Sequence, residues 1–253
     1  MPLPRHARSY LVLTLALLGA CSDATDLSNH PCQPVEHHGD TYIVCSFDAA
    51  SDTIRLFHSD AEGVPFLQFD TLARELSETG ETLIFAMNGG MYHEDRSPVG
   101  YYRDQYGDQA SVNLNDGPGN FHLKPNGVFW LTAGQAGISE SESFLSLEFE
   151  LSYATQSGPM MVVDGELHPE INPDGTSRRR RNGVGVDEDG RTVRFAISDG
   201  AVSFYDFATL FRDRLGLPNA LFLDGQVSRL YAPGINRNEA GTDMGPIVGV
   251  VEQ

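Results

Sequence analysis

The sequence predicts an α+β fold, a single domain of mixed, mainly antiparallel β-sheet with a few helices. Short runs of β-branched and aromatic residues recur along the chain, and Gly, Pro, Asn or Asp bounds most of them. The 26 glycines and 14 prolines show no fixed period, which favours many turns over a helical bundle or a repeat array. Helical segments are few and do not alternate strictly with strands, so a doubly wound parallel sheet is not expected.

Composition narrows the possible functions. The 253 residues are 40% hydrophobic, enough for one substantial core or two small ones, which argues against intrinsic disorder. The 35 acidic residues outnumber the 17 Lys and Arg, and the formal charge of -18 argues against a general binder of nucleic acid or of anionic membranes. No P-loop, G-x-G-x-x-G, H-E-x-x-H or zinc-spaced Cys pair occurs, so we expect neither a cofactor nor a metal.

The amino terminus predicts export. Arg5 and Arg8 precede a nearly continuous apolar run, and small residues then lead to Cys21. A buried core helix is the alternative, but basic flanks at the extreme terminus are typical of a signal peptide. The run Leu-Gly-Ala-Cys resembles the bacterial lipobox, which implies a lipoprotein signal peptide over residues 1–20 and lipid on Cys21 as the only membrane contact. Ser22 resembles an outer-membrane sorting signal, so we expect the protein on that membrane, facing the periplasm or the cell exterior.

Residues 21–39 are polar and without periodicity, and we interpret them as a flexible tether before one domain over residues 40–253. With Cys21 lipidated, Cys32 and Cys45 remain as a pair in an oxidising compartment. A disulfide between them is expected, worth about 3 kcal/mol by the loop-entropy estimate. Two buried free thiols are the alternative.

Nine strands and two helices are expected in the domain. The strands fall at 42–47, 53–58, 83–87, 128–131, 145–151, 160–163, 193–197, 221–223 and 247–251. One helix begins at a cap formed by Asp70 and stops at Gly80. In the other, Ser203 and Asp206 form a capping box and Gly216 ends the helix.

A first candidate ligand loop follows the strand at 83–87. Asn88, Gly89 and Gly90 come next, and paired glycines let a ligand approach the backbone amides closely. Titratable residues at 93–95 stand beside them. An ordinary Asn-Gly turn with solvated acids is an equal alternative.

A second cluster, at 115–127, is so dense in Asn, Asp, Gly and Pro that regular structure is not expected. It carries His122 and Lys124, the only lysine in the chain, and both suit an anionic oxygen. Asn120 and Asn126 suit sugar hydroxyls. A long surface loop with an incidental basic residue is the alternative.

Three Asp-Gly pairs lie at or after the ends of apolar runs, beginning at Asp164, Asp199 and Asp224. Such a pair is most often a hairpin turn. Asp224 differs because its run is fully apolar, and a carboxylate at the mouth of a buried strand is a candidate acid or base. Ser157 is a candidate contact and not a nucleophile, since the sequence around it lacks the glycines of a G-x-S-x-G elbow.

Four arginines stand together at residues 178–181. Neighbouring side chains diverge, so at most one or two can reach a site. We select Arg181, next to the following strand, because its guanidinium fork matches phosphate oxygens. The other three are expected to pair with surface acids or with an anionic envelope.

Taken in order, these motifs resemble the phosphodiester glycosidase domain family over about residues 41–251. The motifs are Asn88-Gly89-Gly90-Met91, Ser157-Gly158-Pro159 with Val162-Val163-Asp164-Gly165, Arg181-Asn182-Gly183-Val184-Gly185-Val186 and Leu223-Asp224-Gly225. Stretches 96–100, 116–122 and 224–231 resemble a bacterial exported subgroup. Where the family typically has Asp-Gly-Gly-Gly-Ser, this chain has Asp224-Gly225-Gln226-Val227-Ser228, and the larger residues are expected to narrow the pocket.

The resemblance implies an exported hydrolase that cleaves a glycosidic bond to phosphate, in a sugar-1-phosphodiester of an envelope or extracellular glycan. Asp224 takes the carboxylate role, while His122 and Arg181 steady the departing phosphate. The expected substrate contacts are Asn88, Gly89, Gly90, Lys124, Ser157, Asn182 and Ser228. A non-catalytic glycan-binding envelope lipoprotein is one alternative. A metal-dependent phosphodiesterase, which needs His or carboxylate ligands that converge in space, is another.

Overall fold

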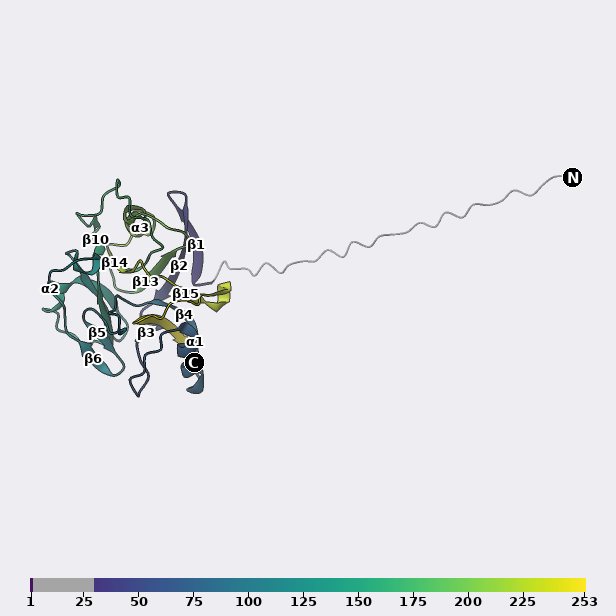
Figure 1. Cartoon of the computed structure of the whole chain (residues 1–253), viewed down its shortest axis with the longest axis horizontal. Coiled ribbons are helices and arrows are strands. Elements are labelled where there is room, and N and C mark those ends of the chain that lie inside the picture. The colour runs from purple at the N-terminus through teal and green to yellow at the C-terminus, as the bar shows by residue number, and fades with distance from the viewer. Residues whose placement is uncertain (2–29) are drawn as a thin grey trace.

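The structure is a computed structural model, and it describes Met1 and residues 30–253 (Figure 1). Three sheets form an α+β domain, as the sequence predicts, and every pairing between the named strands is antiparallel. The lipidation site Cys21 and the expected signal peptide, apart from Met1, lie outside the described residues.

The largest sheet has seven strands. Their spatial order is β1 (Cys32–His37), β2 (Asp40–Asp48), β13 (Thr192–Ser198), β12 (Asn182–Val186), β14 (Asn219–Asp224), β10 (Met160–Val163) and β11 (Glu166–Leu167). All five residues of β12 are buried, and so are all but the first of β14. The centre of this sheet is therefore covered on both faces, as in other layered domains.

Two five-stranded sheets complete the domain. One has the order β16 (Arg237–Asn238), β15 (Leu230–Ala232), β4 (Thr82–Asn88), β17 (Ile247–Glu252) and β3 (Thr53–Phe57). The other has the order β6 (Gly107–Ala110), β5 (Tyr102–Asp104), β9 (Tyr153–Ser157), β7 (Gly127–Leu131) and β8 (Ala136–Glu140).

The three sheets share one hydrophobic core. Phe195 of β13 lies at its centre, with its ring centroid 5.1 Å from that of Phe85 of β4 and 5.9 Å from that of Phe129 of β7. These aromatic side chains come from a different sheet each, so burial of their surface holds the sheets together. The ends of the strands are thereby fixed relative to one another, which matters for the site described below.

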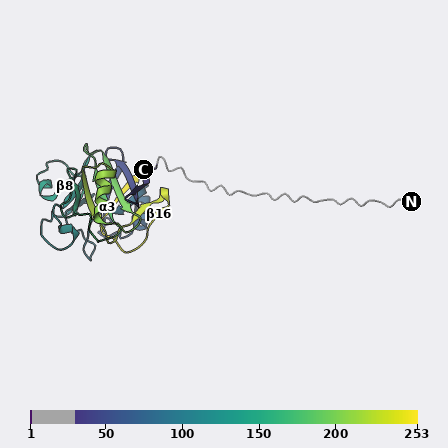
Figure 2. The same ribbon diagram turned by 90° about the horizontal axis from the view of Figure 1, so that it is seen from above.

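Helices cover the outer faces. The helix α3 (Phe204–Thr209) continues into the π-helical turn η2 (Leu210–Arg214), and both pack on the seven-stranded sheet through Phe207 and Phe211, with α3 in front of its strands in Figure 2. The helix α1 (Phe69–Glu78) packs against β4 and β17. The remaining helical turns are α2 (Ser141–Phe144), η1 (Asn120–His122) and η3 (Pro233–Ile235). No helix among the described residues is long and apolar enough to cross a membrane.

The two expected helices form, but one cap differs. Ser203 caps α3 as predicted, because its Oγ accepts a hydrogen bond from the Asp206 backbone N–H at 2.9 Å. Asp70 does not cap α1: the helix begins at Phe69 after Gln68, and the Asp70 carboxylate instead accepts from Asn238 Nδ2 at 3.0 Å.

The strand expected at 145–151 is wrong. After β8 the Glu140 carboxylate accepts from the backbone N–H groups of Glu142 and Ser143, which starts α2 and turns the chain away from the sheet. The following residues find no partner strand, and Leu145 and Phe149 remain 59% and 39% exposed. Alternating apolar and acidic residues mimic a strand here without one forming.

The expected tether is wrong in its second part, because β1 occupies Cys32–His37 and pairs with β2. Its first part, residues 21–29, lies outside the described residues. Cys32 lies directly opposite Cys45 in this pairing, and the predicted disulfide between them is confirmed, with an S–S distance of 2.05 Å. Pro34 hides the strand in the sequence. A proline cannot donate to a ladder, but β1 is an edge strand, where this is tolerated.

Candidate active site

Strand ends from all three sheets meet around Asp224. Asn182 at the start of β12 pairs with Asp224 at the end of β14, and its Nδ2 donates to Asn88 O, at the end of β4, at 3.0 Å. Ser157, at the end of β9, donates from Oγ to the Leu223 carbonyl at 3.3 Å. The structure thus brings together four predicted site residues from four distant segments of the chain.

The Asp224 carboxylate is held by its own loop and is nearly buried, with 7% of the residue exposed. Its Oδ1 accepts hydrogen bonds from the backbone N–H groups of Gln226 at 2.6 Å and Val227 at 3.2 Å. Its Oδ2 accepts one long bond, from Asn88 Nδ2 at 3.4 Å. Burial raises the pKa of this carboxyl above its ordinary value, although the backbone donors oppose the shift. Oδ2 is therefore the oxygen with capacity left for a substrate.

The amide side chains around Asp224 are buried and form hydrogen bonds within the protein. Asn88 and Asn182 are 0% exposed, and Asn88 Oδ1 accepts from the Arg229 backbone N–H at 2.8 Å. Ser228 Oγ lies 2.9 Å from the Asp224 carbonyl and 3.2 Å from Asn182 Oδ1. These side chains hold the Asp224 loop in place. The direct sugar contacts predicted for Asn88, Asn182 and Ser228 stay a prediction. Such a contact would have to use an atom that is not already engaged in these hydrogen bonds.

Gly89 and Gly90 lie where the chain packs closely on its neighbours. A Cβ on Gly89 would lie 2.8 Å from the backbone of Ile247 and Val248 in β17, and one on Gly90 would lie 2.7 Å from Thr155 Oγ1. The Cβ side of both glycines is therefore filled by protein, and the substrate contact expected of their backbone stays a prediction. They permit β4 and the chain after it to pack closely on neighbouring strands.

Arg181 is the largest fully buried side chain of the described residues, with 1% exposed. Its Nε donates to Val202 O at 3.1 Å and its Nη2 to Ser177 O at 2.9 Å, while the guanidinium carbon lies 4.1 Å from the centroid of Phe204. None of these partners is an acid. Burial, and next the charge of Arg179, lowers its pKa to about 10, so the group is still a cation at neutral pH.

The free end of this guanidinium faces the Asp224 loop. A Cβ built on Gly225 would lie 3.5 Å from Arg181 Nη1, and this nitrogen donates to no residue in the described part of the chain. A buried charge without a counter-ion is costly. An anion beside Gly225 would supply that counter-ion one residue from the buried carboxylate.

His122 and Lys124 are not joined to this cluster by any contact among the described residues. His122 Nδ1 lies 2.9 Å from Asn115 O, and the Lys124 ammonium donates to the carboxylate of exposed Asp116 at 2.8 Å. The anion that Lys124 meets is thus a side chain of its own loop. The turn η1 does approach the site from outside, since a Cβ on Gly158 would lie 2.6 Å from Phe121 O.

Two residues close to Asp224 escaped the sequence analysis. Arg229 is 95% buried and donates through Nη1 to Gln68 Oε1 at 2.8 Å and through Nη2 to Thr242 O at 2.6 Å, so it pins the loop at 241–243. Burial raises the pKa of Tyr92, and the nearby Asp224 charge adds to the rise. Tyr92 comes directly after the Asn88-Gly89-Gly90-Met91 motif, and Arg229 comes directly after Ser228. Their positions in the sequence do not show where their side chains point.

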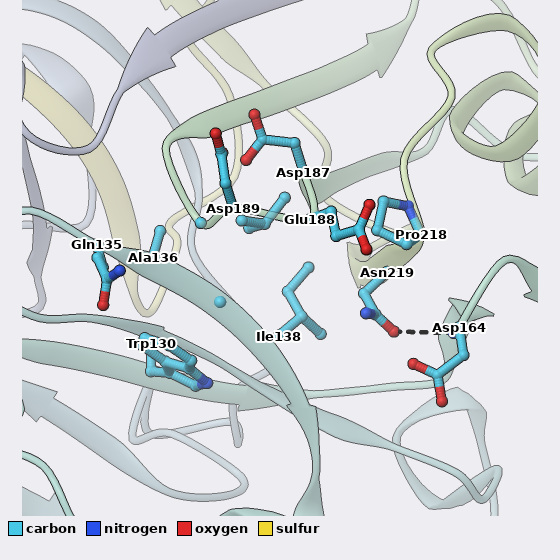
Figure 3. A pocket seen from close by; sticks show the side chains of 13 residues that line it. Trp130, Gln135, Ala136, Ile138, Asp164, Asp187, Glu188, Asp189, Pro218 and Asn219 are labelled. Atoms are coloured by element: carbon cyan, nitrogen blue, oxygen red, sulfur yellow. Dashed lines mark hydrogen bonds between the residues drawn. The ribbon is translucent and has the colours of Figure 1, made fainter.

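One well-formed cavity lies away from this cluster. It has a volume of about 560 Å³ and opens where Val186 pairs with Asn219, at the opposite end of β12 and β14 from Asp224 (Figure 3). Figure 3 shows acidic side chains around it, namely Asp164, Asp187, Glu188 and Asp189. Carboxylates repel a phosphate, so this cavity does not fit an anionic substrate.

A metal-dependent phosphodiesterase would need several His or carboxylate side chains close enough in space to bind one metal ion. Among residues 1 and 30–253, no group of three or more His, Cys, Asp or Glu is placed to hold a metal ion. Of the Asp-Gly pairs, Asp164-Gly165 forms the hairpin between β10 and β11. Asp199 pairs with Arg237 on the surface at 2.9 Å.

A buried carboxylate beside a buried and unpaired arginine, on an antiparallel α+β scaffold, defines a candidate site for an anionic substrate. Residues 81–250 match the phosphodiester glycosidase family, and the chain belongs to this family of hydrolases. It is 33% identical over 228 residues to the uncharacterized protein YigE of Escherichia coli K12, covering 90% of this chain and 85% of YigE.

Two solved structures share the fold. The catalytic domain of zebrafish N-acetylglucosamine-1-phosphodiester α-N-acetylglucosaminidase, auto-inhibited by its pro-peptide, superposes with a TM-score of 0.62 at 13% identity, covering 88% of this chain and 82% of that one. A hypothetical protein from Synechocystis superposes with a TM-score of 0.54 at 14% identity, covering 88% of this chain and 61% of that one. The resemblance to the family noted in the sequence is therefore confirmed.

Proposed function

We propose that the protein hydrolyses the bond between the anomeric carbon of a sugar and the phosphate of a sugar-1-phosphodiester, in a glycan of the cell envelope or its surroundings. One observation carries the proposal: a buried arginine without an acidic partner, Arg181, faces the loop of a buried carboxylate, Asp224. Membership of the phosphodiester glycosidase family supports the same reaction class.

In this proposal Arg181 Nη1 binds a non-bridging oxygen of the phosphodiester, and Asp224 Oδ2 faces the anomeric carbon. As the C–O bond breaks, the electron pair leaves with the phosphate and the sugar becomes a cation, which the carboxylate stabilises or attacks. A phosphate is a good leaving group because its pKa is low, so it needs little protonation. Water then adds its oxygen to the anomeric carbon and gives one proton to the departed phosphate monoester, which releases the free sugar.

The test is turnover of synthetic sugar-1-phosphodiesters by the purified domain. Asp224→Asn keeps the shape of the side chain and removes its charge, so turnover should fall roughly 10²–10⁴-fold, the usual range for one acid or base group. Asp164→Asn is the matched control, since it also changes an Asp-Gly pair after a strand but lies on the surface. Equal activity of Asp224→Asn and wild type would reject the role of Asp224. A wild type that binds glycans yet hydrolyses no diester would favour a non-catalytic glycan-binding protein.

We also propose that the protein is exported and anchored by lipid on Cys21, on the outer membrane and facing the periplasm or the cell exterior. The supporting observations are the basic, apolar and small residues before Cys21 and the disulfide, which suits an oxidising compartment. Cys21→Ala should move the processed protein from the membrane fraction to the soluble fraction. Retention of that variant in membranes at high salt would show that the lipobox is not the anchor.

A further inference from the structure

The four consecutive arginines at 178–181 differ in their partners. Arg178 donates to the Asp40 carboxylate at 3.2 Å, and Arg180 makes two hydrogen bonds to the Glu239 carboxylate, at 2.6 Å and 2.8 Å. The expectation that arginines of this run pair with surface acids is therefore confirmed for these two. Arg181 has no acidic partner, as shown above, and neither has Arg179 among the described residues.

Hydrogen bonds at Val202 place the backbone of Arg179 beside the Arg181 guanidinium. Arg179 and Val202 form an isolated antiparallel bridge, with N–H···O distances of 3.1 Å and 2.8 Å in the two directions. The Arg181 side chain reaches back along the chain toward this bridge, because its Nη2 donates to Ser177 O at 2.9 Å. Val202 O accepts both the Arg179 N–H and Arg181 Nε, which places the two residues at the same point of the fold.

The two arginines differ in depth. Arg181 is buried beside the Asp224 loop, while Arg179 is exposed, and its charge contributes to the lowered pKa of Arg181. Two cations held together without an acid oppose folding, in a chain that has 35 acidic residues available to pair with them. An anionic ligand with one charge in the site and a second near the surface would relieve this repulsion.

We infer that Arg179 is a specificity-determining residue at the rim of the site, where it binds a second anionic group carried by the alcohol side of the scissile phosphodiester. This inference rests on the proposed function, in which Arg181 holds the scissile phosphate. A phosphate and a carboxylate both fit a guanidinium fork. The chemical class of the substrate is thus a sugar-1-phosphodiester whose leaving group bears a further negative charge.

The test compares three diesters of one sugar that end in an ethyl, a 2-carboxyethyl or a 2-phosphoethyl group. Binding is measured by calorimetry at low salt in the Asp224→Asn background, so that the diesters are not consumed. The Asp224→Asn protein, the parent in this test, should bind at least one acidic diester about 3- to 10-fold more tightly than the ethyl diester. This is the effect expected of a partly exposed ion pair, and added salt should reduce the preference. The more tightly bound acidic diester identifies the group.

Arg179→Gln should abolish the preference, whereas Arg178→Gln, which removes the same charge from the next residue, should keep it. Equal binding of all three diesters by the parent, a preference that survives in Arg179→Gln, or no binding of any diester would each overturn the inference. Turnover by the protein with Asp224 intact is judged separately. If it binds the acidic diester selectively and hydrolyses none, the proposed reaction fails while the assignment of Arg179 stands.

Discussion

Replacement of Arg181 by methionine tests whether the buried cation is an anion site. Met fills much of the same space between Phe204 and Phe222 but removes the charge. The hydrogen bonds to Val202 O and Ser177 O are lost, at about 1.5 kcal/mol each, and with them a cation–π contact of about 1 kcal/mol. The fall of its pKa from 12.5 to about 10 corresponds to roughly 3 kcal/mol for holding the charge in its buried site, which the variant recovers.

These contributions nearly cancel, so Arg181→Met should remain folded and change the free energy of unfolding by less than about 2 kcal/mol. Ligand binding should respond much more. Loss of a charge-assisted contact worth about 1.5–3 kcal/mol weakens binding roughly 10- to 150-fold.

The assay is calorimetric titration with glucose 1-phosphate and N-acetylglucosamine 1-phosphate at low salt. Arg194→Met is the matched control, because Arg194 lies on β13 and donates to Leu215 O at 2.8 Å, without a contact to the Asp224 loop among the described residues. The control should bind like wild type. If Arg181→Met also binds like wild type, the phosphate lies elsewhere and the account of the site is wrong.

Three further outcomes follow from the structure. Gly89→Ala should destabilise the fold by about 1–3 kcal/mol in thermal unfolding, because its Cβ would press on the β17 backbone, whereas Gly200→Ala, with open space around it, should not. Reduction of the Cys32–Cys45 disulfide should lower the free energy of unfolding in urea by about 3 kcal/mol, and no change would contradict a role in holding β1. Because the pKa of Asp224 is raised, the folded protein binds the proton of this carboxyl more tightly than the unfolded chain does. The stability that this group contributes is therefore lost as the pH rises from the pKa in the unfolded chain through the pKa in the folded protein. Wild type should therefore gain stability relative to Asp224→Asn as pH falls from neutral into that window, and parallel pH profiles would refute the shift.

Local patterns predicted eight of the seventeen strands among the described residues, including β4 and β14, which end at the site. Asn88 and Asp224 stand out in the sequence because polar residues interrupt apolar runs there, and that signal is local. Their mutual contact depends on the common core of three sheets around Phe195, which no spacing encodes. The sequence therefore indicated the members of the site and not their roles.

The internal partners of the candidate site residues were not predicted. The oxygen of the Asn88 amide accepts from the backbone of Arg229, from a distant segment, and Lys124 meets Asp116 within its own loop. The substrate contacts expected of both residues stay predictions. Arg181 was selected from its four-residue run only because it adjoins a strand, and the structure adds that it alone of the four is fully buried.

The bond that breaks distinguishes a glycosidase from a phosphodiesterase most directly. Hydrolysis of a sugar-1-phosphodiester in water enriched in heavy oxygen, followed by mass spectrometry of both products, shows where the water oxygen goes. Attack at the anomeric carbon, with Asp224 stabilising the cation and Arg181 the departing phosphate, places the label in the released sugar and leaves the phosphate unlabelled. Label in the phosphate would mean that water attacked phosphorus, and would contradict the account.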